Sequence, residues 1–406
     1  MNLAILSASY LRKRPATSGL NVLILALGIA TIVVLLLVSS QIRDNLTRNS
    51  RGIDLVVGAK GSPLQLILSS VYQIDSPTGN IDIDAAEAVM SHRAVKTAIP
   101  LALGDSYRGF RLVGSTHDYP AHYGARTAAG RLWETPGEVT LGAVVARQTG
   151  LAVGDVFESS HGLDADGETH EDSRLLVTGI FEDTGTVLDR LVMTGIPTVW
   201  RIHGIGEASG HEGDASDGAI ESEGPPRQYT SLLISYSSPM AAAVFPRFVN
   251  TQTDLQAAAP AYETARMFEL LGVGFDAIRV FGFILVVTAV LSVFVALLGA
   301  LKDRRYDLAM MRTLGAPRRK LMTHVLLEGL LLSGMGCLLG LILGHAAAMV
   351  LGVALENAQG MALGGFTLLP EEGYVVLFAL VAGLAAALIP AWQAYRTDIA
   401  RILAER

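Results

Sequence analysis

The sequence of 406 residues contains a single cysteine, Cys337. One cysteine excludes a disulfide within the chain and a metal site built from several thiolates. Charged residues are also sparse, at 17% of the chain, and aromatic residues make up 6%, whereas half of the residues are hydrophobic. The mean hydropathy is +0.41, although a water-soluble protein needs a largely polar surface. This composition predicts that much of the chain faces lipid.

The sequence lacks the short motifs of common catalytic and nucleotide sites. It has no GxxxxGK[ST] phosphate loop, no HExxH zinc motif and no GxSxG nucleophile motif. Residues 58–62 (GAKGS) contain a lysine and a serine, but in the wrong frame for a phosphate loop. We therefore expect no catalytic residue and no cofactor bound by this chain, and a membrane-bound enzyme is the least favoured class of function.

The apolar residues gather in four blocks, at residues 20–39 and about 280–301, 326–350 and 374–391. About 20 apolar residues at 1.5 Å per residue cross the hydrocarbon core of a bilayer. The first block follows a basic segment (residues 12–14), as a cleavable signal peptide would. However, it exceeds the usual apolar core of a signal peptide and has no clear AxA cleavage site, so we predict a span.

Charge is divided between the polar segment and the rest of the chain. Residues 41–272 carry 17 Lys/Arg and 29 Asp/Glu, a net charge of −12, and the remainder carries 14 and 9, a net charge of +5. The basic residues gather before the first block, between the second and third blocks, and after the fourth. Because short cytoplasmic loops are enriched in Lys and Arg, we expect both termini to be cytoplasmic. The acidic segment makes nucleic acid an unsuitable partner.

The fold class that these patterns predict is a membrane protein with four transmembrane helices. A large α+β extracytoplasmic domain lies between helices 1 and 2 on a helical stalk. The predicted parts are a basic N-terminus (1–19), helix 1 (20–40), the extracytoplasmic domain with its stalk (41–277), helix 2 (278–301), a cytoplasmic coupling segment (302–321), helix 3 (322–351), a short outer loop (352–372), helix 4 (373–392) and a cytoplasmic C-terminus (393–406).

Within the extracytoplasmic domain, β-branched and apolar runs alternate with turn residues, which predicts a mixed domain. Strands are expected at 54–58, 108–113, 156–157, 175–181, 198–200 and 229–235, and helices at 83–92, 143–149 and 240–251. The stalk helices are expected at 43–50 and 261–277.

Two acidic segments, 159–173 and 204–228, contain little that a core could bury and are expected to be unstructured. Histidines gather there among carboxylates, and imidazole with carboxylate can hold a transition metal. Their wide spacing favours two solvated loops, so a metal site with zinc remains the alternative interpretation. The candidate ligands are His161, His170, His203 and His211.

The third apolar block contains Gly336, Gly340 and Gly344 on one helical face. Small residues at this spacing let two helices approach closely in lipid. Packing within the bundle is the first interpretation, and an interface between subunits is the alternative. Glu328 and His345 also lie in or near this block. An ion or proton relay is the less favoured interpretation of these two ionisable residues.

Residues 303–320 (DRRYDLAMMRTLGAPRRK) resemble the loop of the FtsX-like permease domain of ABC transporters. The family pattern there is roughly RxxE[IL][AG][IL][LM][RK][AT][LIM]G[AM], and the chain departs from it at Asp307, where the family usually has glutamate. Residues 390–396 (PAWQAYR) are similar to the family's closing PAxxAxR. The order of parts is typical of MacB and LolC/LolE type permeases. Residues 54–68 also resemble permeases of zinc-handling systems.

This resemblance implies a non-catalytic transmembrane subunit of the mechanotransmission class, which acts with a separate ATPase that binds ATP and Mg²⁺. A short amphipathic helix with an apolar face at Leu308, Met311 and Leu314, stopped by Gly315 and Pro317, would dock on that ATPase. The residues expected to take part in coupling are Arg304, Arg305, Asp307, Leu308, Met311, Arg312, Leu314 and Gly315.

The resemblance also implies an inner-membrane location in a bacterium, contact with membrane lipid, a homodimer or a pseudo-dimer with a related permease, and a possible extracytoplasmic partner protein. Two other functions stay open. One is an FtsX-like scaffold that transmits a signal to an extracytoplasmic hydrolase. The other is a permease of a metal-handling system.

Overall fold

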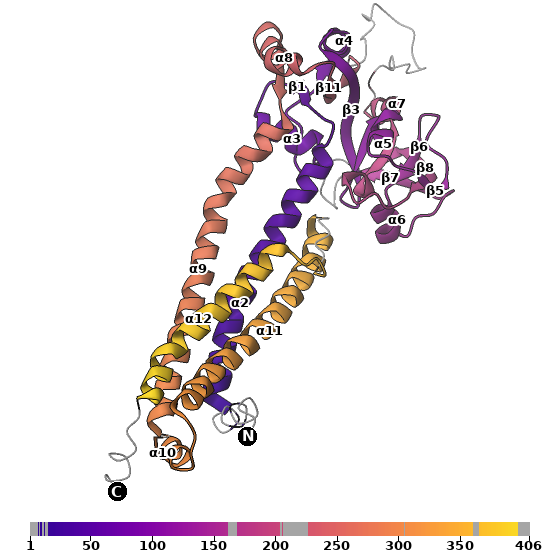
Figure 1. Cartoon of the computed structure of the whole chain (residues 1–406). Helices are drawn as coiled ribbons and strands as arrows, with labels where there is room; N and C mark the ends of the chain where they lie inside the picture. Colours follow the sequence, from indigo (N-terminus) through magenta and orange to yellow (C-terminus); the bar gives the residue numbers. More distant parts are fainter. Residues whose placement is uncertain are drawn as a thin grey trace, which may run out of the picture. The chain divides into compact units, whose positions relative to one another are not determined.

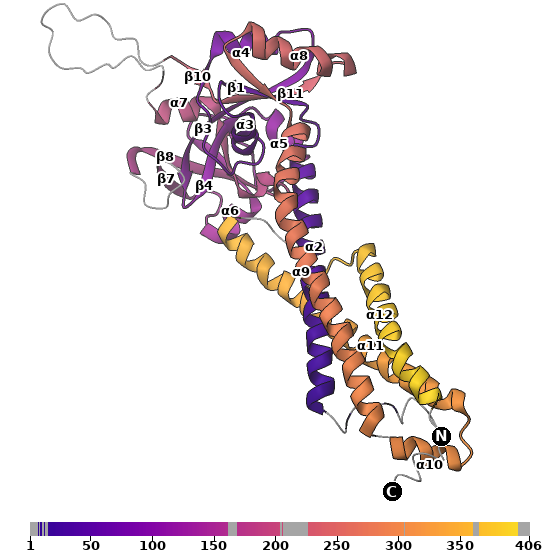
Figure 2. The ribbon, with the colours of Figure 1, turned by 90° about the vertical axis from the view of Figure 1, so that its left-hand side faces the viewer.

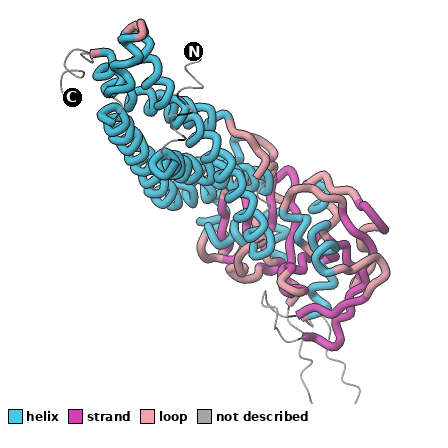
Figure 3. Tube along the Cα trace, turned by 90° about the horizontal axis from the view of Figure 1, so that it is seen from below, coloured by secondary structure: helices cyan, strands magenta, loops and turns pink. Residues whose placement is uncertain are grey.

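The structure, a computed structural model, describes residues 7, 9, 12, 15–160, 169–203, 205, 226–303, 305–359 and 365–396. The chain divides into two units: unit 1 comprises Met1–Arg43 and Leu270–Arg406, and unit 2 is Asp44–Glu269. Unit 1 is helical, and unit 2 contains the strands (Figure 3). The helices α2 (Pro15–Ser50) and α9 (Pro260–Asp303) each begin in one unit and end in the other.

Unit 1 contains four helices that are long and apolar enough to cross a membrane. The qualifying segments are Pro15–Ser50, Gly274–Lys302, Arg318–Ala354 and Pro370–Tyr395. They belong to α2, α9, α11 (Arg318–Gln359) and α12 (Pro370–Tyr395), and the short helix α10 (Arg305–Thr313) lies between α9 and α11 (Figure 1). The expected layout of four apolar helices with an α+β domain between the first and second is confirmed.

The bundle in unit 1 is held together by apolar side chains and by glycines that let backbones approach. Gly28 of α2 lies against Val286 of α9, because a Cβ on Gly28 would be 3.1 Å from the Val286 side chain. A hydrogen bond from Ser292 Oγ to Asn21 Oδ1 (2.5 Å) joins the same two helices. The main buried cluster of the bundle contains Leu25, Ile29, Val33, Leu37, Val286, Ala289, Cys337, Ala348 and Ala379.

Figure 2 shows several of the strands of unit 2. Ten strands form one sheet with the order β12-β1-β11-β3-β4-β9-β6-β8-β5, in which β7 pairs with β3 and β8. The pairs β4–β9 and β6–β8 are parallel and the other pairs are antiparallel. A separate small sheet pairs β10 with β2. The strands are β1 (Leu55–Ala59), β2 (Ile81–Asp82), β3 (Val95–Tyr107), β4 (Phe110–Ser115), β5 (Thr127–Gly130), β6 (Glu138–Leu141), β7 (Val156–Ser160), β8 (Thr169–Phe181), β9 (Val192–Gly195), β10 (Gln228–Tyr229), β11 (Ser231–Tyr236) and β12 (Leu255–Ala258).

Short helices cover this sheet over two separate hydrophobic cores. One core lies under α4 and α8 and includes Leu55, Leu232 and Phe245. The other includes Leu141, Val145 of α6 and Leu175. The helices of unit 2 are α3 (Pro63–Ser70), α4 (Ile83–Met90), α5 (Asp118–His122), α6 (Ala143–Thr149), the 3-10 helix η1 (Val187–Arg190), α7 (Ile196–Ile202) and α8 (Pro239–Gln252).

Two expectations for unit 2 were wrong. The run Thr198–Trp200 was expected as a strand but lies in α7, because Pro197 in the first helical turn favours helix initiation after Gly195. The segment 159–173 was expected to be unstructured, yet its ends belong to β7 and β8, which pair Ser160 with Thr169. Residues 161–168 and 206–225 lie outside the described residues.

Candidate functional site

The helix α10 stands between the second and third apolar helices and packs on the chain's own bundle through one side. Leu308 is buried there and Met311 is partly buried. Their cluster draws its other members from α9, α11 and α12, which fixes α10 against the ends of these helices. The buried members are Leu301, Leu308, Leu321, Val325, Ala391 and Ala394.

The apolar face expected from the sequence is therefore divided. Leu308 is buried within the chain, whereas Leu314 is 83% exposed. The side of α10 that is open to a partner instead carries Tyr306 and Met310, both exposed, in line with Leu314 just beyond the helix. Residues spaced by four lie on one helical face. Sequence reasoning missed this second face, although its four-residue spacing was a readable signal.

The other residues expected to couple with an ATPase are only partly described. Arg305 and Asp307 belong to α10, Arg312 is half-buried in its last turn, and Arg304 lies outside the described residues. Gly315 ends the segment with φ +95°, in the left-handed region that favours glycine. The amide of Ala316 donates to the carbonyl of Met311 across this turn (3.0 Å). The turn redirects the chain into α11.

The three glycines of α11 lie against α2. A Cβ on Gly336 would be 2.6 Å from the Leu25 side chain, and one on Gly344 would be 2.8 Å from Val33. A Cβ on Gly340 would be 2.7 Å from Ile29 Cβ. Of the two interpretations of this glycine face, the contacts favour packing within the bundle over an interface between subunits.

Two histidine–glutamate pairs occupy unit 1. His345 Nε2 is 3.1 Å from Glu372 Oε2, and His345 Nδ1 is 2.8 Å from the carbonyl oxygen of Gly365. The second carboxylate oxygen, Oε1, accepts from the Leu369 amide (3.1 Å). These contacts connect α11 to the start of α12 and to the segment before it. The partly buried His345 and the buried Glu372 therefore form a polar contact within the bundle.

The other pair lies near the start of α11. His324 Nε2 and Glu328 Oε1 are 3.8 Å apart, both side chains are buried, and His324 Nδ1 is 2.7 Å from Ser7 Oγ. Sequence analysis singled out Glu328 and His345, but it did not identify His324 or Glu372 as their partners. The two pairs are separate, so they form no continuous chain of described groups.

Within unit 2, the C-terminal end of α2 and the N-terminal end of α9 are hydrogen-bonded to the rest of the domain. Arg48 Nη1 donates to the Gly185 carbonyl (3.0 Å), and Asn49 Oδ1 accepts from the Val187 amide (2.9 Å). Tyr72 Oη is 2.7 Å from Thr264 Oγ1 of α9, and Tyr123 Oη donates to the Asn49 carbonyl (3.1 Å). Polar contacts as well as the chain connection therefore tie both helices to the domain.

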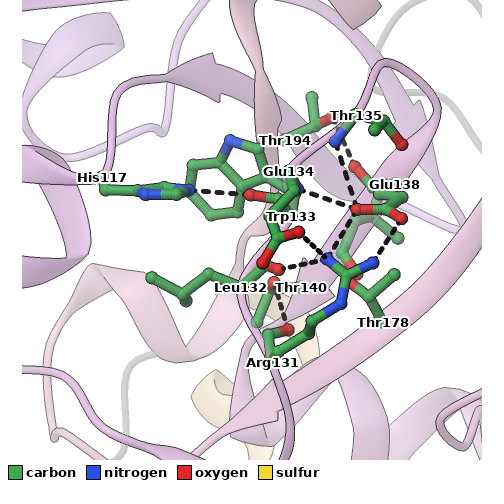
Figure 4. A network of polar contacts seen from close by, with 11 residues as sticks. His117, Arg131, Leu132, Trp133, Glu134, Thr135, Glu138, Thr140, Thr178 and Thr194 are labelled. Atoms are coloured by element: carbon green, nitrogen blue, oxygen red, sulfur yellow. Dashed lines mark hydrogen bonds and ion pairs between the residues drawn. The ribbon is translucent and has the colours of Figure 1, made fainter.

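Unit 2 also contains a shallow cavity of about 350 Å³ beside the loop 131–138. Glu138 fixes this loop: Arg131 donates to both of its carboxylate oxygens (2.6 and 2.8 Å), and the amides of Glu134 and Thr135 donate to Oε2 (Figure 4). Arg131, and next the Glu134 amide, lower the pKa of Glu138 to about 2. The cavity is lined by Thr116, His117, Trp133, Glu134, Thr135, Pro136, Gly195, Pro197 and Thr198.

Two of the four histidines proposed for a metal site lie among the described residues. His161 and His211 lie outside the described residues, and His170 lies in β8. His203 Nε2 is 3.7 Å from Asp105 Oδ1, and Asp105 also accepts from Ser159 Oγ (2.7 Å). Among the described residues, no group of three or more His, Cys, Asp or Glu is placed to hold a metal ion. Zinc binding stays a prediction.

Comparison with known proteins places both units in one family. Residues 18–214 match the MacB-like periplasmic core domain, and residues 279–399 match the FtsX-like permease C-terminal domain. The chain is an FtsX/MacB-type ABC transporter permease. The matched segments contain the domain between the first two apolar helices as far as residue 214, the segment of α10 and nearly all of the last three apolar helices. The permease is therefore a multi-pass membrane protein.

A curated relative agrees with this assignment. The permease is 25% identical over 273 residues to the lipoprotein-releasing system transmembrane protein LolC of Haemophilus influenzae. The match covers 66% of the permease and 64% of LolC, so it spans less than two thirds of that relative.

Two solved structures are similar to about half of the permease. The periplasmic region of MacB from Actinobacillus actinomycetemcomitans has a TM-score of 0.32 and 13% identity, over 55% of the permease and 97% of that structure. The extracellular domain of the noncanonic ABC-type transporter YknZ from Gram-positive bacteria has a TM-score of 0.28 and 11% identity, over 50% of the permease and 98% of that structure.

Proposed function

We propose that the permease couples ATP hydrolysis by a separate ATPase to movement of unit 2 on the other side of the membrane. The observation that carries this proposal is the exposed apolar face of α10, formed by Tyr306, Met310 and Leu314. A short helix between two spans needs only its buried side to pack on the bundle. An additional apolar face is unfavourable in water, but it becomes favourable when a groove of a partner protein buries it.

The two shared helices support a mechanical role for the permease. The helices α2 and α9 have no break between the apolar spans and unit 2. Hydrogen bonds of Arg48, Asn49 and Thr264 fasten their ends to the domain. A displacement along either helix would therefore be carried into the domain through strong local contacts.

The proposal includes an orientation and an assembly. The basic segments support an orientation with both termini and α10 in the cytoplasm of a bacterium, and with unit 2 outside its inner membrane. Two permease chains, identical or related, would pair with two ATPase chains that bind ATP and Mg²⁺. Hydrolysis belongs to those chains, and the permease itself contributes no catalytic residue.

Affinity purification of the tagged permease from its own host in mild detergent tests the role of α10. We expect mass spectrometry to identify a P-loop ATPase with the wild-type chain and with Phe366→Asp, and to lose it with Leu314→Asp. Phe366 is the matched control because it is an equally apolar side chain, 90% exposed, in the segment between α11 and α12. Recovery of no ATPase with the wild-type chain, while other complexes survive, would contradict the proposal.

The same experiment separates the proposal from the other two functions. An extracytoplasmic hydrolase among the recovered chains would favour an FtsX-like scaffold, and a metal-binding protein would favour a metal-handling system. Loss of the ATPase from both Asp variants would show that the effect is not specific to α10.

A further inference from the structure

The helix α8 of unit 2 has two apolar faces. One face packs into the core through Ala241, Phe245 and Val249. The other faces solvent with three large apolar side chains spaced by four residues: Met240 (73% exposed), Val244 (61%) and Phe248 (38%). Single exposed apolar residues are ordinary on a protein surface, but three in line over two turns form a continuous stripe that marks an interaction site.

This stripe, which we name the α8 stripe (Met240, Val244 and Phe248), has a rigid base. The imidazole of His92 stacks on Phe248 with 5.0 Å between ring centroids, and on the buried Phe245 with 4.7 Å. The amide of Ala94 donates to His92 Nδ1 (3.2 Å), which fixes the imidazole. A partner would therefore bind a surface that is already ordered, and little side-chain entropy is lost on binding.

The helix α8 itself carries only positive charge, although the segment 41–272 has a net charge of −12. The helix α8 contains no acidic residue, and its one charged side chain is the exposed Arg247, next to Phe248. The exposed Arg93 lies at the other end of α8, because its carbonyl accepts from Ser237 Oγ (2.9 Å) just before the helix. A basic edge on an acidic domain selects a partner with carboxylates.

We propose that the α8 stripe is the docking surface for an acidic amphipathic helix of an extracytoplasmic partner protein. Apolar side chains of the partner helix pack on Met240, Val244 and Phe248, and its flanking carboxylates pair with Arg93 and Arg247. From Met240 to Phe248 the helix α8 rises about 12 Å, which matches about two turns of a partner helix. The unbranched Met240 adapts to the shape of the partner side chains.

A designed peptide tests this surface on the full chain. The permease is placed in nanodiscs of partly anionic lipid, and empty nanodiscs are subtracted. The probe is a labelled helical peptide of about 16 residues with leucines on one face and glutamates beside them. A second peptide carries lysines in place of the glutamates. Binding is measured by fluorescence anisotropy.

We expect the glutamate peptide to bind the permease, and Val244→Glu to weaken it about tenfold or more, because a charge is placed in the centre of the apolar contact. The matched control is Val153→Glu, since Val153 is also an exposed apolar residue of unit 2 (44%) but lies before β7. It should leave binding unchanged. Arg247→Glu should weaken the glutamate peptide and strengthen the lysine peptide.

Three results would overturn the proposal. One is binding no tighter than to empty nanodiscs, and another is equal weakening by Val244→Glu and Val153→Glu. The third is a change of oligomeric state in sedimentation caused by Val244→Glu alone, which would assign the α8 stripe to a second copy of the chain. Both valines are exposed, so the variants are expected to fold. The peptide assay needs no ATPase, so its outcome is independent of the role proposed for α10.

Discussion

Ile29 of α2 and Gly340 of α11 leave no room for another side-chain atom between them. A Cβ on Gly340 would be 2.7 Å from the Cβ of Ile29 and 2.9 Å from the carbonyl oxygen of Ala26. Because the carbonyl belongs to a backbone, it cannot rotate away as a flexible side chain could. This contact makes the spacing of α2 and α11 sensitive to a single methyl group.

Replacement of Gly340 by alanine is therefore expected to destabilise the bundle by about 1–3 kcal/mol, the usual cost of overpacking. Gly334→Ala in the same helix is the matched control, because a Cβ there would meet nothing within 4 Å. The control should be neutral or slightly stabilising, since alanine favours a helix over glycine. Thermal unfolding of the two purified variants measures the difference, and equal melting temperatures would show that the close contact carries no cost.

Leu308 and Leu314 should separate stability from partner binding. Leu308→Ala removes a buried side chain from the cluster under α10 and should lower the free energy of unfolding by about 2–4 kcal/mol. Leu314→Ala should leave stability within about 0.5 kcal/mol, because its side chain is exposed. Thermal unfolding in detergent checks both values. Strong destabilisation by Leu314→Ala would place that side chain in the fold rather than on a docking face.

The carboxylate of Glu138 should make the loop 131–138 sensitive to acid. Its pKa falls from the ordinary 4.5 to about 2 in the folded state. Ionised Glu138 therefore stabilises the fold when the pH is above about 4.5. This contribution is lost as the pH falls from about 4.5 toward 2. Near neutral pH, Glu138→Gln should lower the melting temperature, and the deficit should shrink in that acidic range. Fluorescence of the nearby Trp133 provides the readout.

Glu134→Gln is the control for this prediction. The side chain of Glu134 is 66% exposed and lies 3.7 Å from Arg131, so it should contribute little. A deficit of Glu138→Gln that stays constant down to the lowest pH would show that the charge of Glu138 is not the cause.

The pair His345 and Glu372 should behave as one unit. Removal of one partner takes the contact from His345 Nε2 or from Glu372 Oε2, so His345→Leu and Glu372→Leu should each destabilise the bundle by about 2–4 kcal/mol. The double variant should cost less than the sum of the two single variants, because it removes both polar groups. Unfolding of the three variants completes the cycle. Additive costs would mean that the two side chains act independently.

The apolar spans were predictable because a run of about 20 apolar residues is a local signal that can be read without knowing what the helix packs against. The sides of the helices were harder to predict. Leu308 and Leu314 were expected on one face, yet at 100° per residue they are about 120° apart on a helix. The bundle buries the first and leaves the second exposed. Which side of α10 packs inward depends on α9, α11 and α12 together, and a single sequence does not show that packing.

Partners distant in the sequence were equally hidden. His345 was identified as an intramembrane ionisable residue, but its contact with Glu372 depends on how α11 and α12 meet. The α8 stripe was overlooked for a different reason. The helix that carries Met240, Val244 and Phe248 was predicted, but the sequence alone did not show which of its apolar residues belong to the core and which are exposed. By contrast, Pro197 offered a local signal for α7 that the β-branched residues after it obscured.

The hydrogen bond between Asn21 and Ser292 has a consequence for how the permease is made. The two residues are 271 positions apart, so the ribosome completes unit 2 before the partner of Asn21 exists. Before α9 is inserted, an apolar face of α2 can be exposed to lipid at little free-energy cost, because lipid tails are as apolar as its leucines. The side-chain oxygen of Asn21 cannot, since lipid offers it no hydrogen-bond donor. During synthesis, α2 therefore carries one polar group that awaits the arrival of α9.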